Sequence, residues 1–100
     1  MAGLDDRARI ALESCIDDTF KDLEGYEESV SLILREQGIE PDLESILSFI
    51  AGFLNGLAHA YYLREYDRPM NDIELDDLSK IMKRRAWELR QAFMSTRVEK

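Results

Sequence analysis

The sequence predicts an all-α protein, an antiparallel helical bundle of three long helices that forms one domain over residues 1–100. Hydrophobic residues recur every three or four positions through three long segments, as they do on one face of an α-helix. No segment alternates with the period of two that is typical of a β-strand. The chain has only 2 Pro and 5 Gly, and an all-β sandwich or barrel needs more turn residues than that.

The first helix is predicted from about residue 4 to residue 37, and Gly38 is placed to end it in the left-handed conformation. Its apolar stripe stays in phase across Gly25. One internal glycine costs about 1 kcal/mol relative to alanine. We therefore expect a single long helix, straight or kinked near Gly25, and keep as the alternative a split there that would give four helices.

The second helix is predicted from Pro41 or Asp42 to Tyr66. Its apolar residues cover more than half of the circumference, so we expect it to be the central helix, surrounded on most sides. The third helix is predicted from about residue 72 to residue 96. Asn71 suits its N-cap, and Glu74 three positions later completes the pattern of a capping box.

The composition indicates a cellular compartment and excludes some kinds of binding site. The formal net charge is −8, and an acidic protein is repelled by nucleic acid and by anionic membranes. A single cysteine, Cys15, excludes an intrachain disulfide and a zinc site built from several cysteines. We expect a cytoplasmic protein without a signal peptide. Residues 45–63 carry no charge, but serines, an asparagine and a histidine interrupt them, so we expect no membrane span.

Small residues recur every four positions on the second helix, at Ser48, Gly52, Gly56 and Ala60. This spacing permits close approach of another helix, either within the chain or in a second copy. Several large apolar residues also remain once the predicted buried stripes are filled, and three helices leave the central one under-covered. We therefore expect a homodimer. Its predicted interface is Gly52, Gly56, Ala60, Leu63, Tyr66, Trp87 and Met94.

Arg85 projects within the apolar stripe of the third helix. Its long side chain reaches solvent along that stripe, or it forms a partly buried ion pair with Asp22 or Asp18 of the first helix that fixes the helix register.

Two further sites remain as alternatives. The first is a nucleic-acid site, in which basic residues of the third helix contact a phosphate backbone. The same residues would otherwise lie on a solvated face or dock on the acidic first helix. They are Lys80, Lys83, Arg84 and Arg90. A small-ligand or catalytic pocket would need Asn55, His59 and Tyr62 to converge.

No phosphate-binding loop, dinucleotide fingerprint or nucleophile motif occurs, so we assign no catalytic, metal or cofactor residue. The favoured function is a non-enzymatic helical interaction module that binds itself or another protein.

Overall fold

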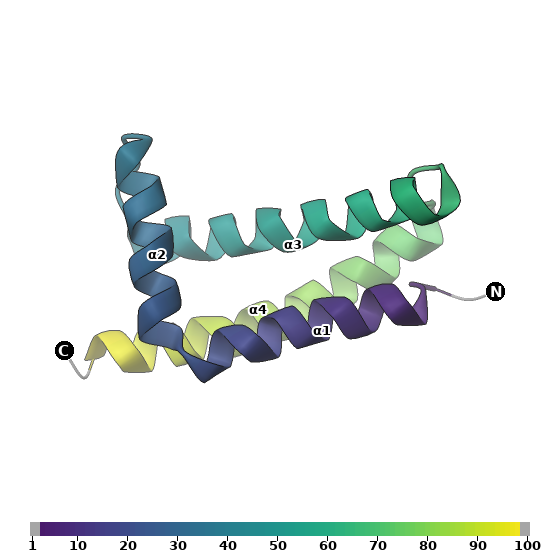
Figure 1. Ribbon diagram of the computed structural model, residues 1–100. Helices are drawn as coiled ribbons and strands as arrows, with labels where there is room; N and C mark the ends of the chain where they lie inside the picture. Colours follow the sequence, from purple (N-terminus) through teal and green to yellow (C-terminus); the bar gives the residue numbers. More distant parts are fainter. Residues whose placement is uncertain (1–2, 99–100) are drawn as a thin grey trace.

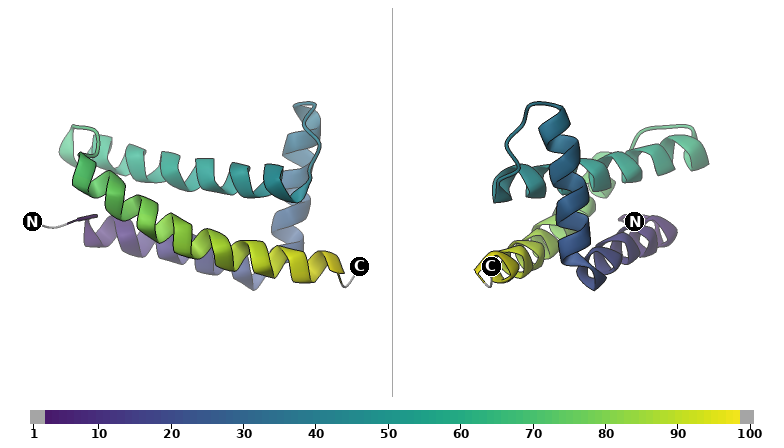
Figure 2. Two further views of the ribbon diagram at one scale, coloured as in Figure 1. Left: turned by 180° about the vertical axis from the view of Figure 1, so that it is seen from behind. Right: turned by 60° about the vertical axis from the view of Figure 1, so that its left-hand side comes forward.

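The computed structural model describes residues 3–98, with side chains described from residue 3 to residue 95, and it is an all-α helical bundle. It has four helices: α1 (Asp6–Lys21), α2 (Leu23–Glu36), α3 (Leu43–Tyr66) and α4 (Asp72–Val98). α3 runs antiparallel to both α1 and α4, and these three lie along the length of the molecule (Figure 1). α2 crosses one end of them (Figure 2). The resulting shape is elongated, with extents of 46 × 26 × 19 Å.

The prediction of one continuous first helix is wrong, because the chain breaks at Asp22, three residues before Gly25. Asp22 has φ −149° and ψ 72°, and its carboxylate accepts a hydrogen bond from the Gly25 N–H at 3.1 Å, which caps α2. A side chain at Gly25 would overlap that carboxylate. The break turns Val30 and Leu34 into the same core as the buried residues of α1. A single straight helix would have carried them past the end of α3.

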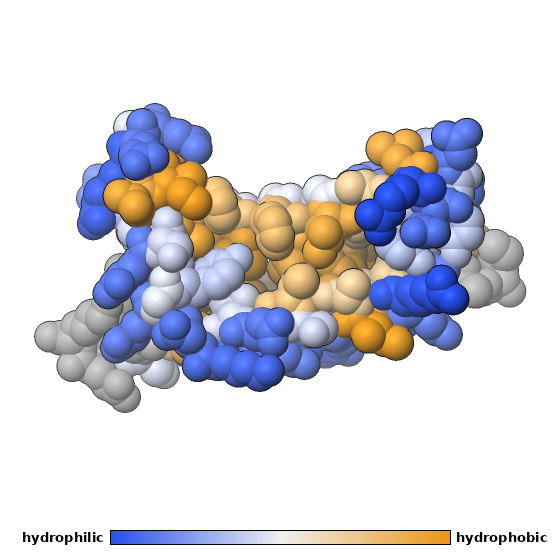
Figure 3. All heavy atoms as spheres, in the orientation of Figure 1, coloured by the Kyte–Doolittle hydropathy of each residue, from blue (hydrophilic) through white to orange (hydrophobic). Residues whose placement is uncertain are grey.

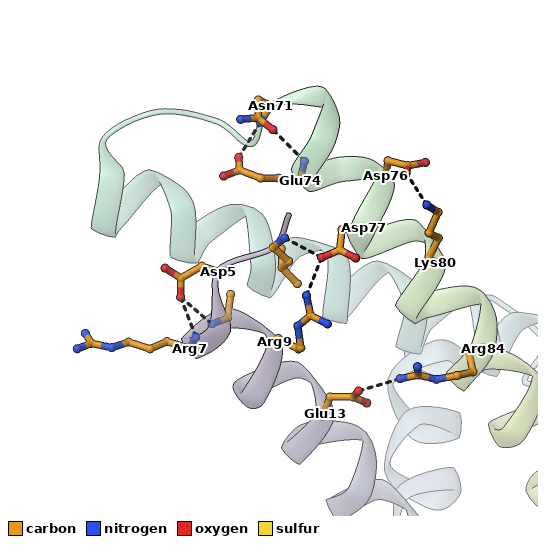
Figure 4. A network of polar contacts seen from close by, with 12 residues as sticks. Asp5, Arg7, Arg9, Glu13, Asn71, Glu74, Asp76, Asp77, Lys80 and Arg84 are labelled. Carbon is orange, nitrogen blue, oxygen red and sulfur yellow. Dashed lines mark hydrogen bonds and ion pairs between the residues drawn. The ribbon is translucent and has the colours of Figure 1, made fainter. Parts of the chain in front are cut away.

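The other predicted helix ends are confirmed. Gly38 has φ +77°, and the Ile39 N–H donates to the Leu34 carbonyl at 2.9 Å, the hydrogen bond of a Schellman motif. Asp42 caps α3 by accepting from the Ser45 N–H at 2.8 Å. Asn71 and Glu74 bond reciprocally, each side chain accepting from the other's backbone N–H, at 2.8 and 2.9 Å (Figure 4). Local sequence therefore fixes these three boundaries.

The core lies where α3 and α4 pack together, with α1 and α2 against them. α3 supplies a line of residues spaced four apart. The largest buried side chain that α4 supplies is Phe93. The fully buried apolar residues of α3 are Ile46, Ile50, Leu54, Ala58 and Tyr62. Burial at this one spacing occupies a single stripe of the helix.

The prediction that this central helix is surrounded on most sides is wrong. α3 is long and apolar enough to cross a membrane by length and composition, with a mean hydropathy of 1.3 over its best 18-residue window, yet only 28% of that window is buried in the fold. Because α2 turns across the end of the bundle, α1 is the one long helix beside α3 on the side away from α4. Much of the apolar circumference of α3 stays uncovered.

The substitution Asp22→Ala tests the break. It removes the cap of α2 and should lower the free energy of unfolding by about 1 kcal/mol, measured by urea denaturation. Asp18→Ala is the control, because Asp18 is exposed and pairs with Lys21 on the surface. Equal stability of the two variants would contradict a capping role for Asp22.

Candidate interaction surface

The uncovered side of α3 is a continuous apolar surface. It consists of Ser48, Gly52, Phe53, Gly56, Leu57, Ala60 and Leu63, which are all exposed and are here called the open face. Phe53 is 51% exposed and Leu63 is 56% exposed. No Asp, Glu, Lys or Arg occurs between Ser45 and Leu63. A face of this length without charge is unusual on a solvated helix, and large exposed apolar patches mark interaction sites.

The two glycines of the open face contact nothing across the helix surface. A Cβ atom built on Gly52 or on Gly56 would meet no atom within 4 Å, apart from the immediate helix backbone. Gly52 and Gly56 therefore do not serve tight packing within the chain, which was one of the two roles predicted for the small residues. The other role, contact with a second chain, stays a prediction.

Two clefts lie beside the open face, between α3 and α1. The first has a volume of about 250 Å³ and is lined mainly by alanines and leucines, with Tyr61 and Arg64 at its edge. The second, of about 230 Å³, is lined by residues of α1, α2 and α3 that include Cys15, Asp18 and Phe53. Figure 3 shows this side as a hollowed apolar surface between two polar ends.

The predicted interface residues do not all share this surface. Gly52, Gly56, Ala60 and Leu63 lie on the open face, whereas Trp87, 65% exposed, lines a cleft of about 370 Å³ between α3 and α4 that includes only Ser48 of the open face. Met94 is an exposed residue of α4. Tyr66 is exposed but its hydroxyl is bonded to Asp5. The structure thus brings together four of the seven residues.

Arg85 forms a partly buried charge cluster, but with partners other than those predicted. Its side chain is 13% exposed and pairs with Glu13 and Asp17, each at 2.6 Å. The predicted pair with Asp22 is wrong because Asp22 caps α2. Glu13 and Asp17 lie four residues apart and so share one face of α1. Arg85 therefore fixes the position of α1 on α4.

The basic residues of α4 mostly have carboxylate partners. Lys80 pairs with Asp76 at 3.1 Å, Arg84 pairs with Glu13 at 2.9 Å, and Arg90 pairs with Glu44 (Figure 4 shows the first two). Lys83 lines the cleft between α3 and α4. A phosphate backbone would have to compete with these carboxylates, and no observation on the described residues favours such a partner.

The residues of the predicted pocket do not converge on a cavity. Asn55 donates its side-chain N–H to the Ala51 carbonyl of its own helix at 2.7 Å. His59 is exposed, and Tyr62 is buried with its hydroxyl accepting from the Asp5 N–H at 2.7 Å. None of the three residues lines any of the three clefts described above.

A cluster around Asp5 was not predicted from the sequence. The Asp5 carboxylate caps α1 by accepting from the Arg7 N–H at 2.7 Å, and it also accepts from the hydroxyls of Tyr61, at 3.1 Å, and Tyr66. The Tyr66 hydrogen bond is the main cause that lowers the pKa of Asp5 below 3.8. The same bond raises the pKa of Tyr66 from 10.0 to about 12.

This cluster anchors the start of α1 on the end of α3. Asp77 of α4 adds to it by accepting from the Leu4 N–H at 2.7 Å and from Arg9 at 2.8 Å (Figure 4). Arg68 lies over the rings of Tyr62 and Tyr66 and is held by Glu74 at 2.8 Å. These contacts fix the start of α1 against α3 and α4.

No group of three His, Cys, Asp or Glu residues within the described part of the chain is arranged to hold a metal ion. Comparison with known proteins gives no family assignment, since no family model, no curated protein and no solved structure matches this chain.

The Asp5 cluster predicts an alkaline titration step. The raised pKa of Tyr66 means that its hydrogen bond stabilises the fold fully below pH 10 and that this contribution is lost as the pH rises toward 12. In a spectrophotometric titration of the phenols, Tyr66→Phe should remove the highest step, and Asp5→Asn should move it toward 10. An unchanged highest step in Tyr66→Phe would show that the bond does not form.

The open glycines predict a gain of stability for the isolated chain. Gly52→Ala and Gly56→Ala should each raise the free energy of unfolding by about 1 kcal/mol, because alanine favours helix and its Cβ meets no neighbour. Urea denaturation at the lowest practical protein concentration measures this change. Gly25→Ala is the matched control and should not gain, because its Cβ would overlap the Asp22 carboxylate. A loss of stability at Gly52 and Gly56 would mean that these sites are packed within the chain.

Proposed function

We propose that this protein is a non-enzymatic helical interaction module that forms a homodimer through the open face of α3. The observation that carries the proposal is the low coverage of α3: only 28% of its most apolar window is buried by the chain itself. Exposing that much uncharged helix to water is costly, at roughly 25 cal/mol for each Å² of apolar surface. A second protein surface removes this cost.

The size of the exposed surface supports the same conclusion. Folded monomers of this mass expose about 5,800 Å², and this chain exposes 6489 Å². The excess of about 650 Å² approaches the roughly 800 Å² that each partner buries in a standard interface. The radius of gyration is 14.6 Å, where a compact chain of this length has about 13 Å. A single copy is thus less compact than a globular monomer.

The open face is suited to a second copy of the same chain. A closed two-fold contact uses one surface on both subunits, so that surface must carry both the projecting and the receiving groups. The open face does carry both, with Phe53, Leu57 and Leu63 set beside Gly56 and Ala60. The lack of charge also means that shape complementarity, not electrostatic steering, determines the partner.

Light scattering coupled to gel filtration at micromolar concentration tests the proposal directly. The expected mass is twice the 11.6 kDa of the chain, with no added partner. A monomeric mass would contradict the homodimer. Flotation of a monomeric chain with phosphatidylcholine vesicles would contradict it in another way, by assigning the open face to lipid.

A charge on the open face should dissociate the dimer. Leu57→Glu should weaken association by at least about 30-fold, the effect of losing an interface hot spot, and give a monomer in the same measurement. Leu32→Glu is the matched control, because Leu32 is a leucine of α2 that lies off the open face and is more exposed than Leu57, at 59% against 37%. Dissociation by both variants, or by neither, would place the interface elsewhere. Helix content by circular dichroism shows that each variant remains folded.

A further inference from the structure

Resting on the proposed homodimer, we infer that the two copies pack their α1–α3 sides together about a two-fold axis, so that Phe53 of each copy fills the alanine-lined cleft of the other. The result is an antiparallel four-helix core of α1 and α3 from both chains, the arrangement in which pairs of helices bury a shared apolar face.

The receiving site is the first cleft between α1 and α3. Its volume is about 250 Å³, and four of the side chains that line it are alanines: Ala8, Ala11, Ala58 and Ala60. An apolar cavity of about 150 Å³ is large enough to bind benzene. The cleft therefore has the size and the lining for an aromatic ring, and no side chain of its own chain fills it.

Phe53 is the side chain that this cleft lacks. It is 51% exposed at the edge of the second cleft. It lies seven residues before Ala60, which puts both on one side of α3, two turns or about 10 Å apart. In its own chain Phe53 lines the second cleft and not the first, so the first cleft is filled by the Phe53 of the other chain.

A two-fold axis perpendicular to α3 provides this register. If the axis passes at the level of Gly56 and Leu57, midway between positions 53 and 60, it reverses the helix and sets residue 53 of one chain opposite residue 60 of the other. The glycine at the axis lets the two helices approach closely, since a Cβ there meets no atom of the chain itself. Both clefts are then covered in one contact.

The charges at the edges of the clefts favour the same antiparallel arrangement. Arg64 lies in the first cleft and Asp18 in the second, at opposite ends of the groove. Reversal of one copy sets the end with Arg64 over the partner end with Asp18. A parallel arrangement would instead set Arg64 opposite the Arg64 of the partner and Asp18 opposite the Asp18 of the partner. Like charges that face each other in an interface are unfavourable.

Engineered cysteine pairs test the register. In a Cys15→Ser background, chains carrying Phe53→Cys and chains carrying Ala60→Cys are mixed and oxidised with copper phenanthroline. We expect the mixed disulfide between the two variants to form at least about tenfold faster than either self-linked product, because a disulfide needs Cα atoms within roughly 7 Å. Leu32→Cys mixed with Ala60→Cys is the control and should link slowly.

The outcomes separate this inference from the proposed dimer. Faster self-linking than mixed linking, in a chain that light scattering shows to be dimeric, overturns the register and leaves the dimer standing. A monomeric parent chain overturns both. As a second measurement, Phe53→Ala should weaken the dimer at least about 30-fold without loss of helix content. A Phe53→Ala dimer as tight as the parent would overturn the role of Phe53.

Discussion

The hydrogen bond that the Asp22 carboxylate accepts from the Gly25 N–H marks the point where α1 ends and α2 begins in a new direction. Because α2 then crosses the end of the bundle, its Val30 and Leu34 reach the core beside α3 instead of extending past it. The same turn leaves α1, which spans Asp6–Lys21, as the one long helix beside α3 opposite α4. The incomplete coverage of α3, and with it the open face, follows from this break.

α1 is held in place both by apolar burial, through Ala8, Leu12 and Ile16, and by charge and hydrogen bonds. Arg85 binds it at two carboxylates, Asp77 binds its N-terminal turn, and the tyrosines of α3 bind Asp5. On the side facing α3, by contrast, α1 presents alanines at Ala8 and Ala11. The small side chains of Ala8 and Ala11, facing Ala58 and Ala60 of α3, leave the space of the first cleft.

Much of the fold could be predicted from the sequence, because its signals are local. Helix stripes are periodic, and the caps at Asn71 and Gly38 act within a few residues. Periodicity alone favours a single first helix, because the apolar residues on both sides of Asp22 keep one helical phase, so the split into four helices that the structure shows is predicted only as the alternative. The aspartate that precedes Gly25 by three positions was the available signal.

The candidate site was less predictable, because its contacts join distant parts of the chain. A buried Arg85 needs an acidic partner, and that need can be read from one helix, but the choice of Glu13 and Asp17 depends on how α1 lies on α4. The cluster at Asp5 joins residues 61 positions apart in its Tyr66 bond, and no pattern along the sequence connects them. The unfilled space around Gly52 and Gly56 is likewise a property of the packed chain.

α3 serves the interior on one side through Ile50 and Leu54, while its other side carries Phe53 and Leu57 at the surface. Adjacent residues of this helix therefore have different roles, one in packing the core and the next in forming the surface. Replacing a residue of α3 therefore alters either the packing of the protomer or the surface that the protein presents.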